Sequence, residues 1–244
     1  MIQTFRPIPV ASLRLYVFDL DGTLVDSAQD LSNSVNAALT LVGENNLPDP
    51  VIASFVGNGV PLLLRRSLAH LPGIAPEDVN NDLFERTQRF FLEHYRDHKL
   101  DFTRLYDGAH EALQTLRKLH ETQGGEPRKL AILTNKPVRP SHGICDGLGL
   151  EGYFERIYGG DSFKTKKPDP EGLIWLMNEL GVKPEETVMV GDSIGDVKVA
   201  RGAGTWSLGC AFGFGPQNIH QAEPDVLVDS PMEWLKVLAP TAAK

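Results

Sequence analysis

Four polar clusters in this 244-residue chain combine side chains that could bind a cation, transfer protons or hold an anion. In chain order they are Asp19-Leu20-Asp21-Gly22-Thr23, Thr134-Asn135-Lys136, the lysines Lys164, Lys166 and Lys167, and Gly191-Asp192-Ser193 followed by Asp196. If the carboxylates converge, each close pair repels by about 4 kcal/mol at an effective dielectric constant of about 20. Something cationic must then lie among them. Because hard oxygen ligands suit Mg²⁺, which also accepts phosphate oxygens, the clusters predict a magnesium site for a small anionic phosphate ester.

Six short apolar runs are expected to be the strands that position these clusters. They are Leu15–Phe18, Leu130–Leu133, Arg156–Tyr158, Thr187–Val190, Thr205–Leu208 and Val226–Val228. Runs without polar alternation are typical of parallel strands covered by helices on both faces. Helical periodicity separates them, at Leu105–Leu119, Leu173–Leu180 and Ile194–Ala203. The alternation predicts an α/β fold with a Rossmann-like open parallel sheet.

The segment from about Val25 to Leu100 interrupts the alternation with helical patterns and no convincing strand. The expected helices are Ala28–Leu41, Pro61–Leu71 and Glu77–Asp97. A helical insertion directly after the first strand is expected to cover the end of that strand. The predicted organisation is therefore a discontinuous α/β core of residues 1–24 and 102–244, with a helical cap domain of residues 25–101 inserted in it.

The first, second and fourth polar clusters each begin where an apolar run stops. Ligands of open α/β sheets bind outside the carboxyl ends of the strands, so these clusters are expected to meet at one edge. Each cluster alone has a structural explanation, because Asp and Gly favour turns and Asp192 or Ser193 could cap a helix. Their joint occurrence at the ends of several strands favours a binding site.

Composition limits the partners. A formal net charge of -8 argues against nucleic acid and anionic membrane surfaces. Residues 1–14 lack the apolar run of a signal peptide and no stretch approaches transmembrane length, so a cytoplasmic protein is expected. The two cysteines, Cys145 and Cys210, have no metal-ligand spacing and are expected to be idle. A monomer and a homodimer both stay open.

The four clusters resemble, in the same order, the four motifs of the haloacid dehalogenase superfamily. The corresponding segments are Asp19–Ser27, Thr134, Lys167 before Pro168, and Gly191–Asp196. They span nearly the whole chain. Within the superfamily, three further segments are most similar to phosphoglycolate phosphatases: Val56–Gly59, Tyr106–Gly108 and Thr134–Lys136. The resemblance implies a magnesium-dependent phosphomonoester hydrolase with 2-phosphoglycolate as the expected substrate.

The resemblance also implies roles for the acidic residues. Asp19 is the expected nucleophile, because a carboxylate that attacks phosphorus splits hydrolysis into two displacements through an aspartyl phosphate. Asp21 is the expected general acid and base, and its backbone carbonyl would also touch the metal. Asp192 completes the metal ligands with Asp19. Asp196 either joins them through water or orients a lysine.

For the phosphoryl group, the resemblance implies three contacts. Thr134 and the backbone amides near Asn135 would hold the phosphoryl oxygens, and Lys167 would neutralise them. Lys166 stays open as an alternative to Lys167.

A loop in the expected cap, Gly57-Asn58-Gly59, precedes Val60-Pro61 in a pattern typical of a helix start. Unpaired amides at such an end attract anions, so Gly57, Asn58 and Gly59 are expected to bind the carboxylate of a substrate such as 2-phosphoglycolate. Arg66 is a candidate to add positive charge. The alternative is a plain turn between two cap helices.

Three other functions stay open. A β-phosphoglucomutase-like isomerase would share the core motifs, although its cap pattern of Arg and Ser is not evident around Phe55–Leu64. A pyrophosphatase or nucleotidase of the same superfamily would share them as well. A binding module without catalysis is the third. Asp21 argues against haloalkanoate dehalogenases, which lack this second aspartate, and against cation-pumping ATPases, which carry Thr there.

Overall fold

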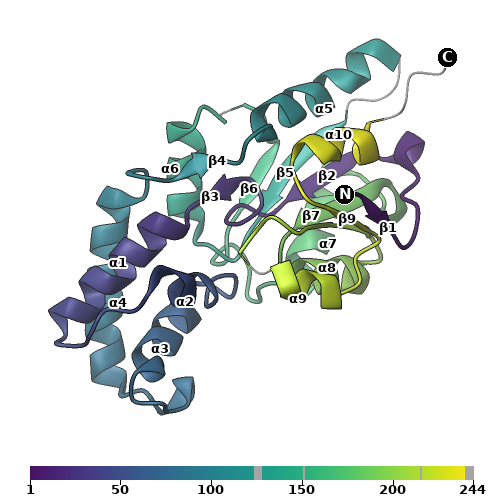
Figure 1. Ribbon diagram of the computed structural model, residues 1–244. Coiled ribbons are helices and arrows are strands. Elements are labelled where there is room, and N and C mark those ends of the chain that lie inside the picture. The colour runs from purple at the N-terminus through teal and green to yellow at the C-terminus, as the bar shows by residue number, and fades with distance from the viewer. Residues whose placement is uncertain (124–127, 151, 215, 240–244) are drawn as a thin grey trace. The chain divides into compact units, whose positions relative to one another are not determined.

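The computed structural model describes residues 1–123, 128–150, 152–214 and 216–239. The chain forms two compact units, which are drawn in Figure 1. The core unit consists of Met1–Val25 and Leu105–Lys244, and the inserted unit consists of Asp26–Arg104.

A seven-stranded sheet lies at the centre of the core unit, in the order β1-β9-β8-β7-β2-β5-β6. Its strands are β1 (Gln3–Thr4), β2 (Leu15–Phe18), β5 (Lys129–Leu133), β6 (Arg156–Tyr158), β7 (Thr187–Gly191), β8 (Trp206–Cys210) and β9 (Val226–Val228). Neighbouring strands run parallel, except that β1 pairs antiparallel with β9. The predicted Rossmann-like open parallel sheet is confirmed.

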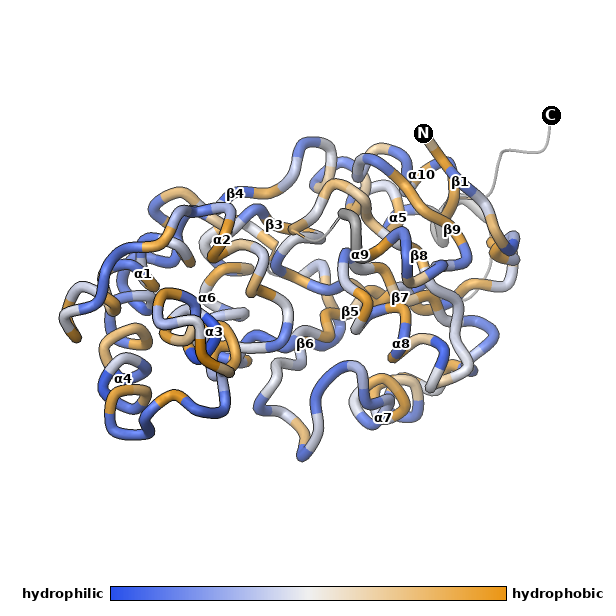
Figure 2. The backbone as a smooth tube through the Cα atoms, turned by 60° about the horizontal axis from the view of Figure 1, so that its bottom comes forward, coloured by the Kyte–Doolittle hydropathy of each residue, from blue (hydrophilic) through white to orange (hydrophobic). Residues whose placement is uncertain are grey.

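Helices cover both faces of this sheet. On one face, a hydrophobic cluster contains residues of α5 (Ala109–Gln123), α6 (Val138–Gly147) and α10 (Met232–Leu238). On the other face, a second cluster contains residues of α7 (Glu171–Leu180) and α8 (Ile194–Ala203). The short helix α9 (Pro216–Gln221) contacts α8 and β8, and 3₁₀ helices lie at Val10–Ser12 and Pro184–Glu186. Figure 2 shows the hydrophobic strands β5 and β7 inside the core unit.

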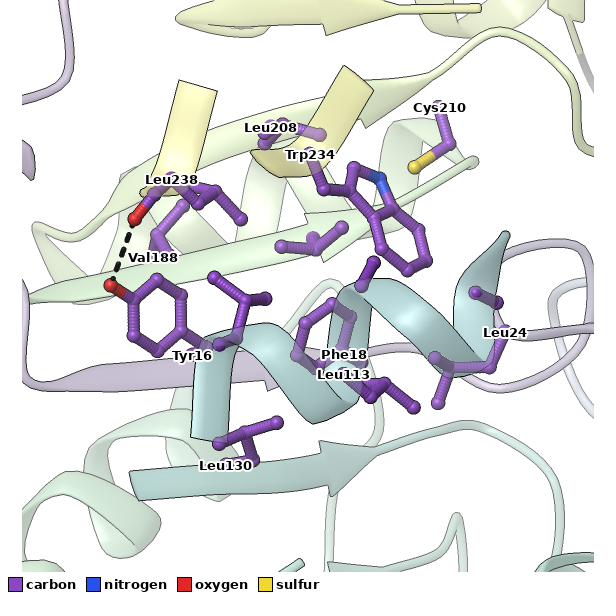
Figure 3. Packing of buried hydrophobic residues seen from close by; sticks show 14 of the residues in the cluster. Tyr16, Phe18, Leu24, Leu113, Leu130, Val188, Leu208, Cys210, Trp234 and Leu238 are labelled. Carbon is purple, nitrogen blue, oxygen red and sulfur yellow. Dashed lines mark hydrogen bonds between the residues drawn. The ribbon is translucent and has the colours of Figure 1, made fainter. Parts of the chain in front are cut away.

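Strand β2 shows why the expected strands have no polar alternation. Leu15 and Val17 belong to the cluster under α7 and α8, whereas Tyr16 and Phe18 belong to the cluster under α5 and α10. Successive side chains of a strand point to opposite faces, so a strand covered on both sides needs apolar residues throughout. In Figure 3, Phe18 packs near Trp234, with ring centroids 5.3 Å apart. The Tyr16 hydroxyl donates to a main-chain carbonyl of α10 at 3.1 Å.

The inserted unit is helical. Its elements are α1 (Ala28–Leu41), α2 (Asp49–Ala53), α3 (Val60–His70), a 3₁₀ helix (Pro76–Asp78) and α4 (Asn81–His98). Their apolar faces form one buried cluster. The carboxylate of Asp30 is buried on α1 and accepts the backbone N–H groups of Phe102 and Thr103 and the Thr103 hydroxyl, at 2.7–3.1 Å. It therefore ties the returning chain to α1.

The single helix expected over Glu77–Asp97 is wrong. Val79 has extended backbone, with φ -63° and ψ 128°. Asn80 then caps α4, because its side chain accepts the N–H of Leu83 at 3.1 Å. An Asn at the N-cap marks the start of a new helix. The apolar periodicity before Asn80 and the periodicity after it therefore belong to two separate helices.

The helix expected over Leu105–Leu119 begins later, at Ala109. Leu105 instead ends β4 (Arg104–Leu105), which pairs with β3 (Val25–Asp26) where the chain passes between the units. Strands of two residues are too short for hydrophobic periodicity to predict them.

Both cysteines are buried. Burial raises the pKa of the Cys145 thiol to about 12. Across the described ranges, none of the helices combines the length and the hydrophobicity that crossing a membrane requires.

Candidate active site

The carboxyl ends of three adjacent strands bring the first, second and fourth polar clusters together. Phe18 at the end of β2 is in register with Ile132 of β5 on one side and with Val190 of β7 on the other. Residues that follow parallel strands in register emerge at the same edge of the sheet. All of the expected core-site residues lie in the core unit.

Asp19, Asp192 and Asp196 form a group of buried carboxylates at this edge. One oxygen from each lies within 4.8 Å of the others. Their exposed fractions are 6%, 4% and 1% respectively. Three carboxylate oxygens at this separation can surround one cation, and an all-oxygen donor set suits Mg²⁺.

The electrostatics of the group favour such a cation. Burial raises the pKa of Asp19 to about 6, while Lys167 acts in the opposite direction and Asp196 adds to the rise. Burial also raises the pKa of Asp192 well above its usual range, and the charges of Asp19 and Asp196 raise it further. A buried carboxylate is stabilised either by a proton or by a nearby positive charge. A bound cation would therefore displace protons from this group.

Lys167 supplies one positive charge. Its Nζ lies 2.6 Å from Asp196 Oδ1 and 3.1 Å from Asp19 Oδ1. Burial acts to lower the pKa of Lys167, but the two carboxylates outweigh burial and raise it, so the ammonium keeps its charge. The alternative, Lys166, has an exposed side chain.

Local hydrogen bonds fix the two later aspartates. The Thr23 hydroxyl donates to Asp192 Oδ1 at 3.1 Å, and the backbone N–H of Phe214 donates to Oδ2 at 2.9 Å. Ser193 caps α8, and Asp196 Oδ2 accepts its N–H at 3.0 Å and its hydroxyl at 2.6 Å. The helix-cap interpretation is thus right for Ser193. The same capping box orients Asp196, whose other oxygen meets Lys167.

Thr134 and Asn135 follow β5 and are both nearly buried. The Thr134 hydroxyl accepts the backbone N–H of Lys136 at 3.2 Å and is hydrogen-bonded to the Asp19 carboxylate. The Asn135 side chain donates to the carbonyl oxygen of Lys167 at 3.0 Å. The side chain of Asn135 therefore fixes the lysine segment, while the expected phosphate contact concerns its main-chain amide.

Asp21 is paired with Lys136, a residue for which no role was predicted from the sequence. Both of its carboxylate oxygens lie close to Lys136 Nζ, at 3.1 Å for Oδ1 and 3.0 Å for Oδ2. The exposed fractions of the two side chains are 4% for Lys136 and 12% for Asp21. The position of Lys136 directly after Thr134-Asn135, at the end of β5, was the signal that could have identified it.

The expected substrate loop belongs to the inserted unit. Gly59 is the N-cap of α3 with φ 87°, and Pro61 lies in the first turn. Arg66 donates to the side-chain oxygen of Asn58 at 3.1 Å and to the carbonyl oxygen of Phe55 at 3.2 Å. Arg66 therefore braces the loop from within the same unit.

Relatives of known name match nearly the whole chain. A phosphoglycolate phosphatase from Pseudomonas putida is 37% identical over 94% of this chain and 80% of its own length. A phosphoglycolate phosphatase from Vibrio vulnificus is 34% identical over 94% of this chain and 98% of its own length. The crystal structure of a predicted phosphoglycolate phosphatase from Haemophilus somnus superimposes with a TM-score of 0.84 at 31% identity. It covers 93% of this chain and 98% of that one.

The family comparison agrees with the geometry. Residues 16–210 match the model of the haloacid dehalogenase-like hydrolases, a range that begins in β2 and ends with β8. This range includes every residue of the carboxylate group and the buried lysines Lys136 and Lys167. The chain therefore belongs to the haloacid dehalogenase-like hydrolase family.

Proposed function

We propose that this protein is a magnesium-dependent phosphatase that hydrolyses 2-phosphoglycolate through an aspartyl phosphate on Asp19. The observation that carries the proposal is the group of Asp19, Asp192 and Asp196, with Lys167 against two of them. Such a site pairs a nucleophilic carboxylate with positions for positive charge around a phosphoryl group.

The donor set fits a divalent cation. Asp19 and Asp192 would hold Mg²⁺ together with the main-chain carbonyl of Asp21, and Asp196 would support them. The raised pKa values of Asp19 and Asp192 support this assignment, because they reflect buried negative charge that a cation would offset. When bound, the ion would act as a Lewis acid that polarises a phosphoryl oxygen.

Asp19 starts the reaction in this proposal. One of its carboxylate oxygens attacks phosphorus, a bond to phosphorus forms, and the bond from phosphorus to the ester oxygen breaks. Thr134 and Lys167 would hold phosphoryl oxygens, and two contacts support these roles: the Thr134 hydroxyl bonds to the Asp19 carboxylate, and the Lys167 ammonium lies 3.1 Å from it. The positioned charges lower the barrier by stabilising the transferring group.

Asp21 completes both steps. It protonates the departing alkoxide and then takes a proton from the water that attacks the aspartyl phosphate. Inorganic phosphate leaves, and the Asp19 carboxylate is restored. Asp21 is suited to proton transfer because its carboxylate is separate from the group of three that could share an ion.

The choice of 2-phosphoglycolate rests on the names of the relatives and on the inserted unit. We propose that residues 26–104 act as a cap and that Gly57, Asn58 and Gly59 bind the carboxylate of the substrate. Arg66 donates a hydrogen bond to the side-chain oxygen of Asn58. The side-chain N–H groups of Asn58 therefore point away from that arginine and can donate to an anion.

A panel of phosphate esters tests the proposal. Free phosphate is measured with Mg²⁺ present for 2-phosphoglycolate, ethyl phosphate, pyrophosphate, nucleoside monophosphates and p-nitrophenyl phosphate, and sugar-phosphate isomerisation is followed in parallel. We expect the highest kcat/KM on 2-phosphoglycolate. A higher value on pyrophosphate or a nucleotide, or isomerisation without phosphate release, would reject the substrate assignment. No turnover of any ester would reject the phosphatase itself.

A variant of the loop sharpens the substrate test. Gly57 has φ 111°, so Gly57→Val strains the backbone of the loop, although an added Cβ would meet nothing within 4 Å. We expect kcat/KM to fall more on 2-phosphoglycolate than on p-nitrophenyl phosphate. Gly73→Val is the matched control, because Gly73 has φ 68° and equally open surroundings in the same unit. Equal losses on both substrates would show that the loop does not read the carboxylate.

A further inference from the structure

The ion pair between Lys136 and Asp21 connects the segments that follow two neighbouring strands, at the edge of the sheet where the site lies. Asp21 follows β2 and Lys136 follows β5, and these strands are in parallel register through Phe18 and Ile132. The ammonium lies 3.0–3.1 Å from both oxygens of one carboxylate. The contact therefore fixes the orientation of the carboxylate as well as its position.

The backbone that carries Lys136 is itself held on both sides. Its N–H donates to the Thr134 hydroxyl at 3.2 Å, and its carbonyl oxygen accepts the N–H of Gly160 at 2.8 Å. Gly159 permits this close approach, because a Cβ there would lie 2.7 Å from the carbonyl oxygen of Lys136. The main chain from which the Lys136 side chain extends is therefore held in place.

The pair also separates Asp21 from the other carboxylates. Asp19, two residues earlier, belongs to the group whose oxygens lie within 4.8 Å of one another, and Asp21 does not belong to it. A carboxylate beside this group would be drawn to any cation bound there. A lysine that engages both oxygens opposes that movement.

We propose that Lys136 is a positioning residue, which holds the Asp21 carboxylate apart from the metal ligands and aims it at the ester oxygen and the attacking water. This inference rests on the role of Asp21 in the proposed function. Lys136 acts through Asp21, so its removal impairs the steps in which Asp21 moves a proton and leaves other functions of the site in place.

Five variants test the inference: Lys136→Met, Lys136→Arg, Asp21→Asn, the double variant Lys136→Met/Asp21→Asn, and Lys198→Met. Lys198 lies exposed on α8 and is the matched control for the loss of a lysine. For each, kcat and kcat/KM are measured on substituted phenyl phosphates that differ in the basicity of the leaving group and carry no carboxylate. The phosphorylated fraction of the enzyme is measured by acid quench during turnover.

Lys136→Met should lower kcat by about 10- to 100-fold, less than the roughly 10²- to 10⁴-fold that general acid–base catalysis contributes, because Asp21 is misplaced and not removed. The loss of kcat/KM should grow with the basicity of the leaving group, because a basic phenoxide needs its proton most. The double variant should be no slower than Asp21→Asn, since Lys136 has nothing left to position. Lys136→Arg should recover part of the loss, and Lys198→Met should match the wild type.

Two results would overturn the inference alone. One is a double variant slower than Asp21→Asn by the full factor of Lys136→Met, which would mean that the lysine acts independently. The other is a loss of kcat/KM in Lys136→Met that is equal for all leaving groups, or no loss. Wild-type turnover in Asp21→Asn would instead remove Asp21 from the mechanism and overturn the inference with it.

Folding does not obscure this test. Lys136→Met leaves a carboxylate without its ion-pair partner in a largely buried place, and thermal unfolding is followed for every variant. Should that single variant fail to fold, the double variant removes both charges, and its comparison with Asp21→Asn decides alone. Equal kcat values support the inference, and a further loss of about 10-fold or more contradicts it.

Discussion

Gly22 leaves room for the carboxylate of Asp192. A Cβ on Gly22 would lie 2.7 Å from Asp192 Cγ, closer than carbon atoms approach without displacement. Gly22 also has φ 83°, a conformation that residues with a side chain rarely adopt. The same carboxylate oxygens accept hydrogen bonds from Thr23 and from the backbone of Phe214, so Asp192 has little freedom to move away.

Replacing Gly22 should therefore damage the metal site. In Gly22→Ala we expect the affinity for Mg²⁺ to fall by about 10- to 100-fold, as when the surroundings of a metal ligand are disturbed. Isothermal titration of the chelated protein with Mg²⁺ measures this directly. Gly43→Ala is the control, because Gly43 has φ 87° but nothing within 4 Å of an added Cβ. Equal Mg²⁺ affinity in the two variants would contradict the account.

The pKa of Asp192 predicts a dependence of stability on pH. Because burial raises the pKa of Asp192 and that of Asp19, the folded state without metal retains protons that the unfolded chain releases. Stability from such groups is present below the unfolded pKa and is lost as pH rises through the folded pKa. Asp192→Asn removes one of these groups without changing the shape of the side chain.

Without metal, Asp192→Asn should thus become more stable than the wild type as pH rises above about 4, where the unfolded wild-type chain releases the Asp192 proton that the folded state retains. With saturating Mg²⁺ the wild type should be the more stable protein, because it keeps the Asp192 carboxylate as a ligand of the metal. Urea unfolding of both proteins, with chelator and with Mg²⁺, measures the two differences. If the difference in the free energy of unfolding between the two proteins does not change with pH in chelator, burial does not raise the pKa of Asp192 and the account is contradicted.

Asp30 should stabilise the inserted unit. Its carboxylate accepts the N–H groups of Phe102 and Thr103 and the Thr103 hydroxyl, so Asp30→Ala leaves these donors without their acceptor. We expect a loss of about 1–3 kcal/mol in the free energy of unfolding, measured by urea denaturation. Asp26→Ala removes an ion pair with Arg104, whose side chain is largely exposed, and a hydrogen bond from the Ala28 N–H at 3.3 Å, and should lose less stability than Asp30→Ala. A smaller loss for Asp30→Ala than for Asp26→Ala would contradict this assignment.

The sequence predicts the strands of the core well, because burial on both faces imposes apolar runs. β2, β6 and β9 have the expected bounds, and β5, β7 and β8 differ from them by one or two residues. The convergence of Asp19 and Asp192 follows from parallel strands alone, since every such strand delivers its next residue to the same edge. That part of the site needs no knowledge of side-chain contacts.

The partner of Asp21 could not be predicted in the same way. Lys136 meets Asp21 because β2 and β5 are neighbours in register and because Gly159 and Gly160 let another segment approach the backbone of Lys136. Neither condition is visible in the order of the residues. The helix break at Asn80 was missed for a different reason, since apolar periodicity continues on both sides of a cap.

The central claim is that Asp19 carries the phosphoryl group in a covalent intermediate. A rapid acid quench tests this claim most directly. Wild type, Asp21→Asn and Asp19→Asn are mixed with Mg²⁺ and 2-phosphoglycolate, quenched in acid, digested and examined by mass spectrometry. We predict one added phosphoryl group on the peptide that contains Asp19, most abundant in Asp21→Asn, and a loss of at least about 10³-fold in kcat for Asp19→Asn. A phosphoryl group on another residue, or wild-type turnover by Asp19→Asn, would contradict the account.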